Sequence, residues 1–413
     1  MNIFPSEYTN LNILMTSDYP LREFIGGSVR LMYEESTHLA KKGHKVHVLT
    51  REELIRHGYD QVKNIQEWKY SINNNNRLLF LKTTLSNSRR LFETLSKKFQ
   101  YQVLNFHQPF SAYGILKSPQ SNKMSKIYTC HSLSFEEYKS RNPNRQRLID
   151  KFFYPLNIIV RKCFESNALR KSDFIIVLSQ YTADKLYKIH GIVPNKIIVI
   201  PGGVDLCRFS PSNNKTQPRA SFGLPKDLFM LLTVRNLVPR MGLENLITAF
   251  KMVLTYRQDL FLLIGGEGPL EEALKEQTRR CGLQDFVRFA GYIPEEDLPS
   301  YYQMANLFIL PTSELEGFGL VTVEALASGL PVLGTPIGGT REILTKLGPN
   351  YLFDDSTPRS IANGILKALN GWATNQEVYR EISQNCRKVA EQYYSWDNHV
   401  SKLEDLFYSM LGN

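Results

Sequence analysis

The apolar positions of this chain form short runs, and these runs alternate with longer stretches in which apolar residues recur every third or fourth position. A short apolar run between turn residues indicates a buried strand, whereas the longer recurrence indicates an amphipathic helix. The predicted strands are residues 12–16, 45–50, 103–106, 126–130, 174–178, 196–200, 229–234, 260–264, 287–292, 307–310 and 331–335. The predicted helices are residues 29–42, 88–99, 145–171, 180–190, 243–256 and 320–328. This alternation predicts an α/β fold with parallel strands joined by crossover helices.

Two stretches give weaker expectations. Pro155 lies inside the predicted helix at residues 145–171, and we expect it to kink or split that helix because proline lacks the backbone N–H. Residues 52–85 are polar and irregular and predict no definite element.

The most informative stretch runs from Asn306 to Glu342 and reads as strand, loop, helix and strand. Glu316 lies in the loop at the carboxyl end of the first strand, and Glu324 lies about a turn into the helix. Ligands of parallel sheets bind beyond the carboxyl ends of the strands. Carboxylates suit sugar and ribose hydroxyls, and the free amides at a helix start suit phosphate oxygens. The combination favours a nucleotide sugar, although two glutamates on a solvated face would be the plainer interpretation of the spacing alone.

Further candidates follow other strands of the first half. Gly26 and Gly27 precede the predicted helix at 29–42, so they fit a ligand at a helix N-terminus or a tight turn without a ligand. His107 and His131 each follow a predicted strand, where a histidine either acts on a substrate or packs with a hydrogen bond. Glu136 and Glu137 are additional candidates for acceptor contacts.

In the second half, Arg235 and Arg240 lie in the loop after the strand at 229–234. Guanidinium groups there can bind a diphosphate through paired hydrogen bonds. Gly266 and Gly268 follow the next strand, but Glu271 occupies the third glycine position of a dinucleotide fingerprint, so a dinucleotide site is disfavoured.

These motifs resemble one known family. The segment "EGFGLVTVEALASGLPVLGTPIGG" closely resembles the Glu-x7-Glu signature of the family-4 retaining glycosyltransferases. The stretches "LAKKGHKVHVLT" after the first glycines and Gly203-Val204-Asp205 with Phe209 are similar to further parts of that family, with Gly202 where asparagine is usual. The resemblance covers nearly the whole chain and is strongest from 199 to 345.

The resemblance implies a GT-B fold, in which two Rossmann-like α/β/α domains face each other across a cleft. It places an acceptor-binding domain at residues 1–204 and a nucleotide-sugar-binding domain at 205–393. Residues 394–413 would form a helix that returns to pack on the first domain.

The resemblance also assigns roles to individual residues. His131 matches a histidine that contacts the donor sugar and the reacting centre, and Arg235 matches an arginine that faces the diphosphate. Met241 stands where the family has lysine, so Arg240 is the substitute that we expect for the missing cation. The expected catalytic residues are His131, Glu316, Arg235 and Arg240. The expected donor-binding residues are Gly26, Gly27, Gly266, Gly268, Tyr292, Gly317, Phe318, Gly319, Leu320 and Glu324.

Composition narrows the cellular context. Residues 1–205 contain 30 basic and 17 acidic residues, a net charge of +13, whereas the rest of the 413-residue chain carries a net charge of −3. A basic first half favours an anionic partner such as a phosphorylated acceptor or an acidic lipid surface. The basic residues are dispersed and no nucleic-acid motif is present, so nucleic-acid binding is not expected. No apolar run approaches the length of a membrane span, and the start lacks the pattern of a signal peptide. We therefore expect a cytoplasmic protein. Peripheral contact with the inner face of the plasma membrane is an open alternative. Five scattered cysteines favour reduced thiols.

The sequence thus predicts a retaining hexosyltransferase that moves a sugar from a UDP- or GDP-sugar to a hydroxyl. The acceptor would be a carbohydrate or a lipid-linked or phosphorylated molecule of cell-surface polysaccharide or glycolipid assembly. We expect no cofactor and no metal, because arginines are available to neutralise the diphosphate. A GT-B epimerase or phosphorylase, and a non-catalytic nucleotide-sugar-binding protein, remain as alternatives.

Overall fold

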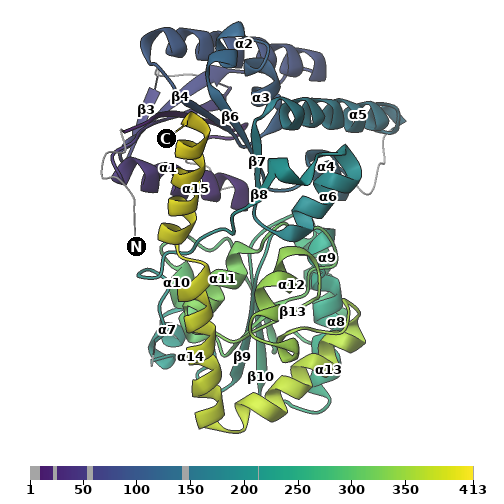
Figure 1. Ribbon diagram of the computed structural model, residues 1–413. Coiled ribbons are helices and arrows are strands. Elements are labelled where there is room, and N and C mark those ends of the chain that lie inside the picture. Colours follow the sequence, from purple (N-terminus) through teal and green to yellow (C-terminus); the bar gives the residue numbers. More distant parts are fainter. Residues whose placement is uncertain (1–9, 22–25, 54–58, 142–147, 213, 413) are drawn as a thin grey trace, which may run out of the picture. The chain divides into compact units, whose positions relative to one another are not determined.

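The computed structural model describes residues 10–21, 26–53, 59–141, 148–212 and 214–412 (Figure 1). The chain divides into two compact units. The described residues up to Leu178, together with Thr182–Ile200 and those from His399 onward, form unit 1. Ser179–Tyr181 and Pro201–Asn398 form unit 2.

Among the described residues, unit 1 contains an eight-stranded sheet in the order β3-β4-β2-β1-β5-β6-β7-β8. The neighbouring strands are parallel except for β3, which pairs antiparallel with β4. The strands are β1 Asn12–Thr16, β2 Lys45–Glu52, β3 Tyr59–Val62, β4 Ile65–Ser71, β5 Val103–Phe106, β6 Ser125–Cys130, β7 Phe174–Val177 and β8 Ile197–Val199. In this order, β1, β5 and β6 are central, so their carboxyl ends lie together at one edge of the sheet.

Helices cover both faces of this sheet. They are α1 Gly27–Lys41, α2 Arg77–Lys98, α3 Pro109–Ile115, α4 Ser134–Arg141, α5 Leu148–Lys171, α6 Gln180–His190 and α15 Trp396–Leu411, with 3-10 turns at Pro119–Lys123 and Pro194–Lys196. Leu14 of β1 packs in a cluster with residues of α2, α3 and α5. Its neighbours Ile13 and Met15 point to the other face and pack with α1 and with residues of α15 from Val400 onward. This alternation along β1 follows from the two-residue period of a strand.

Among the described residues, unit 2 contains a five-stranded parallel sheet in the order β11-β10-β9-β12-β13. Its strands are β9 Phe229–Val234, β10 Leu260–Gly265, β11 Val287–Gly291, β12 Leu307–Leu310 and β13 Val332–Gly334. Its helices are α7 Thr216–Ser221, α8 Leu243–Leu254, α9 Glu271–Arg280, α10 Leu298–Met304, α11 Leu320–Ala327, α12 Gly338–Thr345, α13 Pro358–Ala368 and α14 Gln376–Tyr393, with 3-10 turns at Pro239–Met241 and Pro349–Tyr351 and a π-helical turn at Leu369–Ala373.

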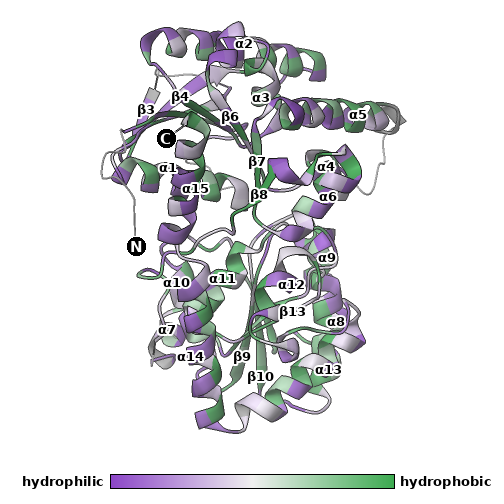
Figure 2. Ribbon diagram, in the orientation of Figure 1, coloured by the Kyte–Doolittle hydropathy of each residue, from purple (hydrophilic) through white to green (hydrophobic). Residues whose placement is uncertain are grey.

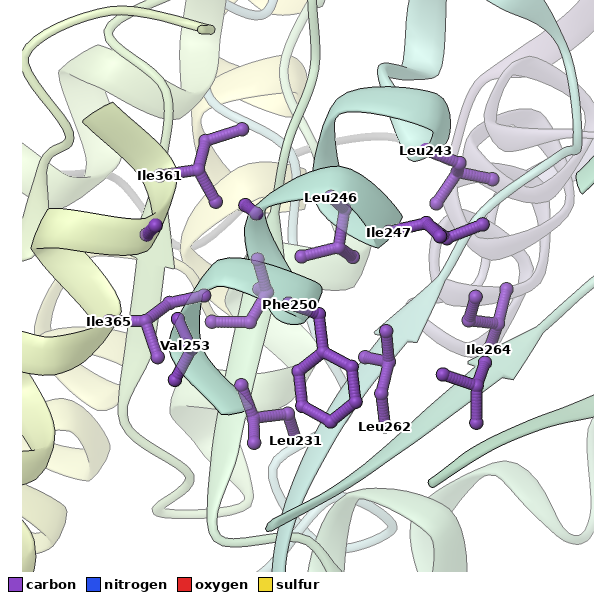
Figure 3. Packing of buried hydrophobic residues seen from close by; sticks show 14 of the residues in the cluster. Leu231, Leu243, Leu246, Ile247, Phe250, Val253, Leu262, Ile264, Ile361 and Ile365 are labelled. Carbon is purple, nitrogen blue, oxygen red and sulfur yellow. The ribbon is translucent and has the colours of Figure 1, made fainter. Parts of the chain in front are cut away.

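The core of unit 2 lies between this sheet and helices α8 and α13. Phe250 of α8 packs against Leu231 of β9 and Leu262 of β10, and Ile365 of α13 closes the cluster (Figure 3). The strands β9 and β10 are coloured as hydrophobic in Figure 2, as expected for strands buried on both faces. These buried strands give a rigid base to the loops at their carboxyl ends.

The predicted α/β class with parallel sheets is confirmed. The sequence did not predict the helices α3, α4, α7, α9, α10, α12, α13 and α14, and it was also wrong within residues 52–99. Residues 59–71 form the strands β3 and β4, and α2 begins at Arg77 rather than near Ser88. The Asn76 side chain caps α2 by accepting the backbone N–H of Leu79 at 2.8 Å, a signal that the asparagine-rich stretch concealed.

The expected split at Pro155 is wrong, because α5 is a single helix with this proline inside it, whereas the expected kink stays a prediction. Pro155 lies on the exposed side, where backbone groups that lose an intrahelical partner can bond to water. Residues 145–147 of the stretch predicted as this helix lie outside the described residues.

Candidate functional site

The loop after β12 and the loop after β9 bring two of the predicted catalytic residues together. Because β9 and β12 are neighbouring parallel strands, their carboxyl ends meet at one edge of the sheet. Nη2 of Arg235 donates to Oε2 of Glu316 and to Oγ1 of Thr312, the latter at 3.1 Å. Arg235 and Glu316 are both buried. A buried ion pair with extra hydrogen bonds fixes both side chains at the sheet edge.

The guanidinium group of Arg235 also contacts Met241, and it has a second nitrogen, Nε, that can donate a hydrogen bond. The sulfur of Met241 lies 2.6 Å from Nη2 of Arg235, so a buried thioether fills the position where the resemblance places a lysine. Nε of Arg235 is buried and has no hydrogen-bond partner among the residues that the structure describes. Because an unpaired buried donor is costly, this N–H is available for an anionic ligand.

Arg240 lies at the backbone of the loop that carries Glu316. Its Nη1 donates to the carbonyl oxygen of Leu315 at 2.7 Å. The backbone oxygen of Arg240 accepts the N–H groups of Ser313 and Glu314 at 2.9 and 3.2 Å. Leu315 has φ of 55°, in the left-handed region that a leucine rarely adopts. Arg240 therefore holds a strained residue next to Glu316, and its expected contact with a diphosphate stays a prediction.

The helix α11 begins directly after this loop. Gly319, with φ of 99°, precedes its first residue, Leu320, and no side chain caps the helix start. The first amides of α11 are therefore available to an anion, together with the partial positive charge of the helix N-terminus. Gly317 and Phe318 form the preceding backbone, and the Phe318 ring packs against Tyr394 with centroids 5.8 Å apart.

Glu324 lies in the second turn of α11 and is buried. Its Oε2 accepts the hydroxyl of Tyr302, on α10, at 2.8 Å. Tyr302 and Thr312 are site residues that sequence reasoning missed. Thr312 could have been found, because it is the first polar residue after the apolar run of β12. Tyr302 could not, because its contact with Glu324 depends on tertiary packing.

The remaining donor-site candidates of unit 2 follow β10 and β11. Gly266 follows β10, and its N–H donates to the carbonyl oxygen of Gly291 at 2.7 Å. A side chain at Gly266 would collide with the carbonyl oxygen of Arg235, so glycine lets these two loops approach each other. A β-carbon at Gly268 would collide with the backbone of Leu237, and Tyr292 is exposed directly after β11.

Unit 1 contains a second group of candidates. Gly26 precedes α1 with φ of 96°, and Gly27 is the first residue of that helix. His107 and His131 follow the neighbouring strands β5 and β6, and Nδ1 of His107 lies 3.1 Å from Nε2 of His131.

Both histidines are neutral near pH 7. Burial lowers the pKa of His131 to about 4, although the Glu137 carboxylate acts in the opposite direction. Burial, with His131 and His399 nearby, holds the pKa of His107 well below its usual value. These side chains can therefore exchange hydrogen bonds but do not supply a positive charge.

Glu136 and Glu137 have partners within unit 1. Nζ of Lys185 donates to Oε2 of Glu136 at 2.6 Å, and the hydroxyl of Ser132 donates to Oε2 of Glu137 at 3.2 Å. Of the two, Glu137 is the one whose charge acts on His131.

No group of three or more His, Cys, Asp or Glu side chains that could hold a metal ion occurs in the described part of the chain. Within those same residues, none of the helices combines the length and apolar character required to cross a membrane.

Comparison with known proteins places this geometry in context. Residues 25–208 match the family model described as Glycosyltransferase Family 4, and residues 214–389 match the model described as Glycosyl transferases group 1. Mannosylfructose-phosphate synthase of Agrobacterium fabrum is 27% identical over 314 residues, which cover 73% of this chain and 67% of that protein. D-inositol 3-phosphate glycosyltransferase of Streptomyces scabiei is 26% identical over 252 residues, which cover 59% of this chain and 55% of that protein.

Solved structures resemble the whole chain. Sucrose-phosphate synthase from Thermosynechococcus elongatus has a TM-score of 0.82 at 22% identity, covering 98% of this chain and 100% of that chain. Anabaena HepE, solved in complex with UDP-glucose, has a TM-score of 0.73 at 17% identity, covering 97% of this chain and 100% of that chain.

Proposed function

The chain belongs to the family 4 and group 1 glycosyltransferases of GT-B fold, and from this we propose that it transfers a hexosyl group from a nucleoside diphosphate sugar to an acceptor hydroxyl, with retention of anomeric configuration. The observation that carries this proposal is the buried Arg235–Glu316 pair beside the uncapped start of α11. A guanidinium group and helix amides bind phosphate, and a fixed carboxylate binds sugar hydroxyls.

In the proposed reaction, the bond between the anomeric carbon and the diphosphate oxygen breaks, and the acceptor oxygen bonds to that carbon on the same face. The electron pair leaves with the diphosphate. Arg235 and the amides at Gly319 and Leu320 stabilise the charge that grows there, and they need little reorganisation because the site is built in advance. The proton of the acceptor hydroxyl passes to the departing diphosphate, so no separate general base is required.

In this proposal, Glu316 and Glu324 bind different parts of the donor. Glu316, oriented by Arg235 and Thr312, holds hydroxyls of the transferred sugar. Glu324, oriented by Tyr302, holds the ribose hydroxyls. Because Arg235 and the helix start neutralise the diphosphate, the proposal requires no metal ion.

In this proposal, unit 1 binds the acceptor. Neutral His131 contacts the donor sugar and the reacting centre through hydrogen bonds, and Gly26 and Gly27 let the start of α1 approach the substrates. We propose UDP or GDP as the nucleotide. The UDP-glucose complex of HepE and the phosphorylated product named for mannosylfructose-phosphate synthase support a nucleotide-sugar donor and a phosphorylated acceptor.

The test is a screen of UDP- and GDP-sugars for release of nucleoside diphosphate with and without candidate acceptors. Transfer predicts release that depends on acceptor, and the anomeric coupling constant of the product, measured by NMR, tests retention. Arg235→Gln and Glu316→Gln should each lower kcat/KM about 100- to 1,000-fold. Glu314→Gln, in the same loop but exposed, is the matched control and should retain activity.

Other outcomes would favour the alternatives. Conversion of the sugar nucleotide without release of diphosphate would indicate an epimerase. Phosphate-dependent cleavage of a glycoside would indicate a phosphorylase. Tight binding of donor with no turnover for any acceptor would indicate a binding protein, and the two variants would then change only the dissociation constant.

The surface of α5 supports a peripheral membrane role in glycolipid or cell-surface polysaccharide assembly. Phe153, Leu156 and Ile159 are 39%, 52% and 57% exposed and follow each other at helical spacing. Lys162 lies one turn further along, and Arg170 and Lys171 end the helix. An exposed apolar stripe with basic neighbours suits the interface of an anionic membrane.

Binding to vesicles tests this part of the proposal. We expect the protein to sediment with vesicles that contain phosphatidylglycerol at low salt, and the variant Leu156→Glu/Ile159→Glu to lose about tenfold in affinity. Val193→Glu, at another exposed apolar position of unit 1, is the control. Equal binding by both variants, or no binding at low salt, would exclude the membrane role and leave a soluble acceptor.

A further inference from the structure

The mechanism above does not use Glu35, a fully buried acidic residue of α1. Its Oε1 lies 2.9 Å from Nε2 of His399 on α15. Its Oε2 lies 3.5 Å from Nε2 of His107, at the end of β5. A carboxylate removed from water is costly unless donors surround it, so this placement requires an explanation.

Two of the buried atoms face each other. Among the described residues, Oε2 of Glu35 and Nε2 of His107 have no conventional hydrogen-bond partner, and the 3.5 Å contact is the one that joins them. Each is therefore the group best placed to satisfy the other, after a small adjustment of either side chain.

The opposite side of the His107 ring leads to His131. Nδ1 of His107 lies 3.1 Å from Nε2 of His131, and the two rings stack with centroids 5.3 Å apart. Glu35, His107 and His399 are buried, whereas His131 is only partly buried. A continuous series of side chains thus runs from His399 through Glu35 and His107 to the candidate catalytic histidine.

The number of protons in this series is limited. If Glu35 accepts a hydrogen bond from each ring, Nε2 of His399 and Nε2 of His107 both carry protons. His107 is neutral, because burial lowers its pKa well below the usual value. Its Nδ1 is then an acceptor, and the proton shared with His131 must belong to Nε2 of His131.

The tautomer of His131 follows from the same reasoning. Its pKa is lowered to about 4, so the ring is neutral near pH 7 and carries a single N–H. With the proton on Nε2, Nδ1 of His131 holds a lone pair. No hydrogen bond to this Nδ1 is seen among the described residues, so it is available to accept one from a hydroxyl.

We propose that Glu35, supported by His399, is a positioning residue that fixes His107 and His131 as Nε2–H tautomers, so that His131 presents an acceptor nitrogen to a sugar hydroxyl. The last clause rests on the proposed glycosyltransferase function, whereas the tautomers do not. Neither Glu35 nor His399 contacts substrate in this arrangement; each acts through His107.

Long-range ¹H–¹⁵N NMR of protein labelled at histidine tests the tautomers directly. We expect the signals of His107 and His131 to show the Nε2–H pattern at pH 7, with assignments from His107→Asn and His131→Asn. Once the two variants have assigned these signals, a proton on Nδ1 of His131 in the wild-type spectrum would overturn the proposal.

The variant Glu35→Gln tests the cause. The amide of glutamine can donate to Nε2 of His107, so we expect the Nε2–H pattern of one or both histidines to be lost. Glu34→Gln changes the neighbouring residue of the same helix, which contacts His38 at 3.7 Å, and should preserve both patterns. A Glu35→Gln protein that is less stable but keeps both tautomers would show that Glu35 is only structural.

Kinetics separate this inference from the proposed function. If both hold, Glu35→Gln should lower kcat about 10- to 100-fold, as loss of a supporting hydrogen-bond partner does, with little change in KM for the donor. His399→Leu should lose activity. His399→Gln keeps an N–H donor for Glu35 and should retain most of the wild-type activity. If the tautomers respond as expected but no sugar is transferred, the function is wrong and the network stands.

Discussion

At the scale of single residues, Arg235 is the side chain on which the unit 2 site depends. One of its terminal nitrogens is shared by the Glu316 carboxylate, the Thr312 hydroxyl and the Met241 sulfur. The thioether contributes no charge, so the positive charge of Arg235 is balanced by Glu316 before any phosphate arrives. A second cation at position 241 would leave a net positive charge, which suits a bound diphosphate but not the empty site.

The variant Met241→Lys should therefore separate stability from ligand affinity. We expect the free protein to lose about 1 to 2 kcal/mol of unfolding free energy, because a buried ammonium would lie beside a guanidinium. Nucleoside diphosphate should bind about tenfold more tightly, since a charged hydrogen bond to phosphate is gained. Thermal unfolding with and without UDP or GDP measures both effects. Met241→Leu should change neither, and weaker binding by Met241→Lys would show that position 241 does not face the phosphates.

At the scale of elements, the loops at the strand ends are held by contacts that glycine alone permits. Gly338, at the start of α12, has φ of 59°, and the N–H of Gly339 donates to the carbonyl oxygen of Glu316 at 2.9 Å. A β-carbon at Gly338 would collide with that same carbonyl oxygen. The start of α12 thus fixes the backbone from which Glu316 projects.

Gly338→Ala should displace that backbone. We expect the free energy of unfolding of unit 2 to fall by about 2 to 3 kcal/mol and KM for the donor to rise several-fold, because both strain and a backbone collision are introduced. Gly348→Ala is a matched control, since its φ is 121° but open space surrounds its β-carbon position. Urea denaturation and donor kinetics measure the two variants. Equal losses in both would mean that backbone strain alone, and not the contact with Glu316, determines the effect.

Elements with strong apolar patterns were the predictable ones. The strands β1, β5, β9 and β12 coincide with the predicted ranges, because each is a buried run with clear turn residues around it. The strands β3 and β4 were missed, because both carry many polar residues and β3 is the edge strand of the sheet. A split at Pro155 was predicted wrongly, because sequence alone does not reveal that this proline lies on the exposed side of α5.

The candidate site likewise contains residues that the sequence predicts and contacts that it does not. Motif and strand order place Arg235 and Glu316 at one sheet edge, and the structure joins them by a hydrogen bond. The contact between Glu35 and His399 links residues 364 positions apart, so no local pattern could indicate it. Contacts of that kind depend on which helices pack on a common sheet face, and this is decided only when the chain is folded.

At the scale of the whole molecule, buried neutral histidines connect stability with pH. His47 of β2 is almost fully buried among Trp68, Phe99 and Tyr101, and its Nδ1 lies 2.6 Å from the hydroxyl of Tyr101. Burial, followed by the charges of Lys45 and Lys98, lowers the pKa of His47 from 6.5 to about 4. His107 and His131 are shifted in the same direction. Between pH 6.5 and 4 the unfolded chain therefore binds more protons than the folded protein at these positions.

The sign of the pH dependence follows from this difference. Stability is fully present above pH 6.5 and is lost as the pH falls toward 4, because unfolding takes up protons in that range. For His47 the full effect is roughly 3 kcal/mol. His47→Gln keeps a hydrogen-bonding group but cannot titrate, so its unfolding free energy, from urea denaturation followed by circular dichroism, should depend less on pH than that of the wild type. Tyr101→Phe should lose about 1 kcal/mol at every pH and keep the wild-type slope, since His47 still titrates there. If His47→Gln and the wild type lose stability in parallel as the medium is acidified, the acid sensitivity arises elsewhere, and the pair His107 and His131 would be the next positions to replace.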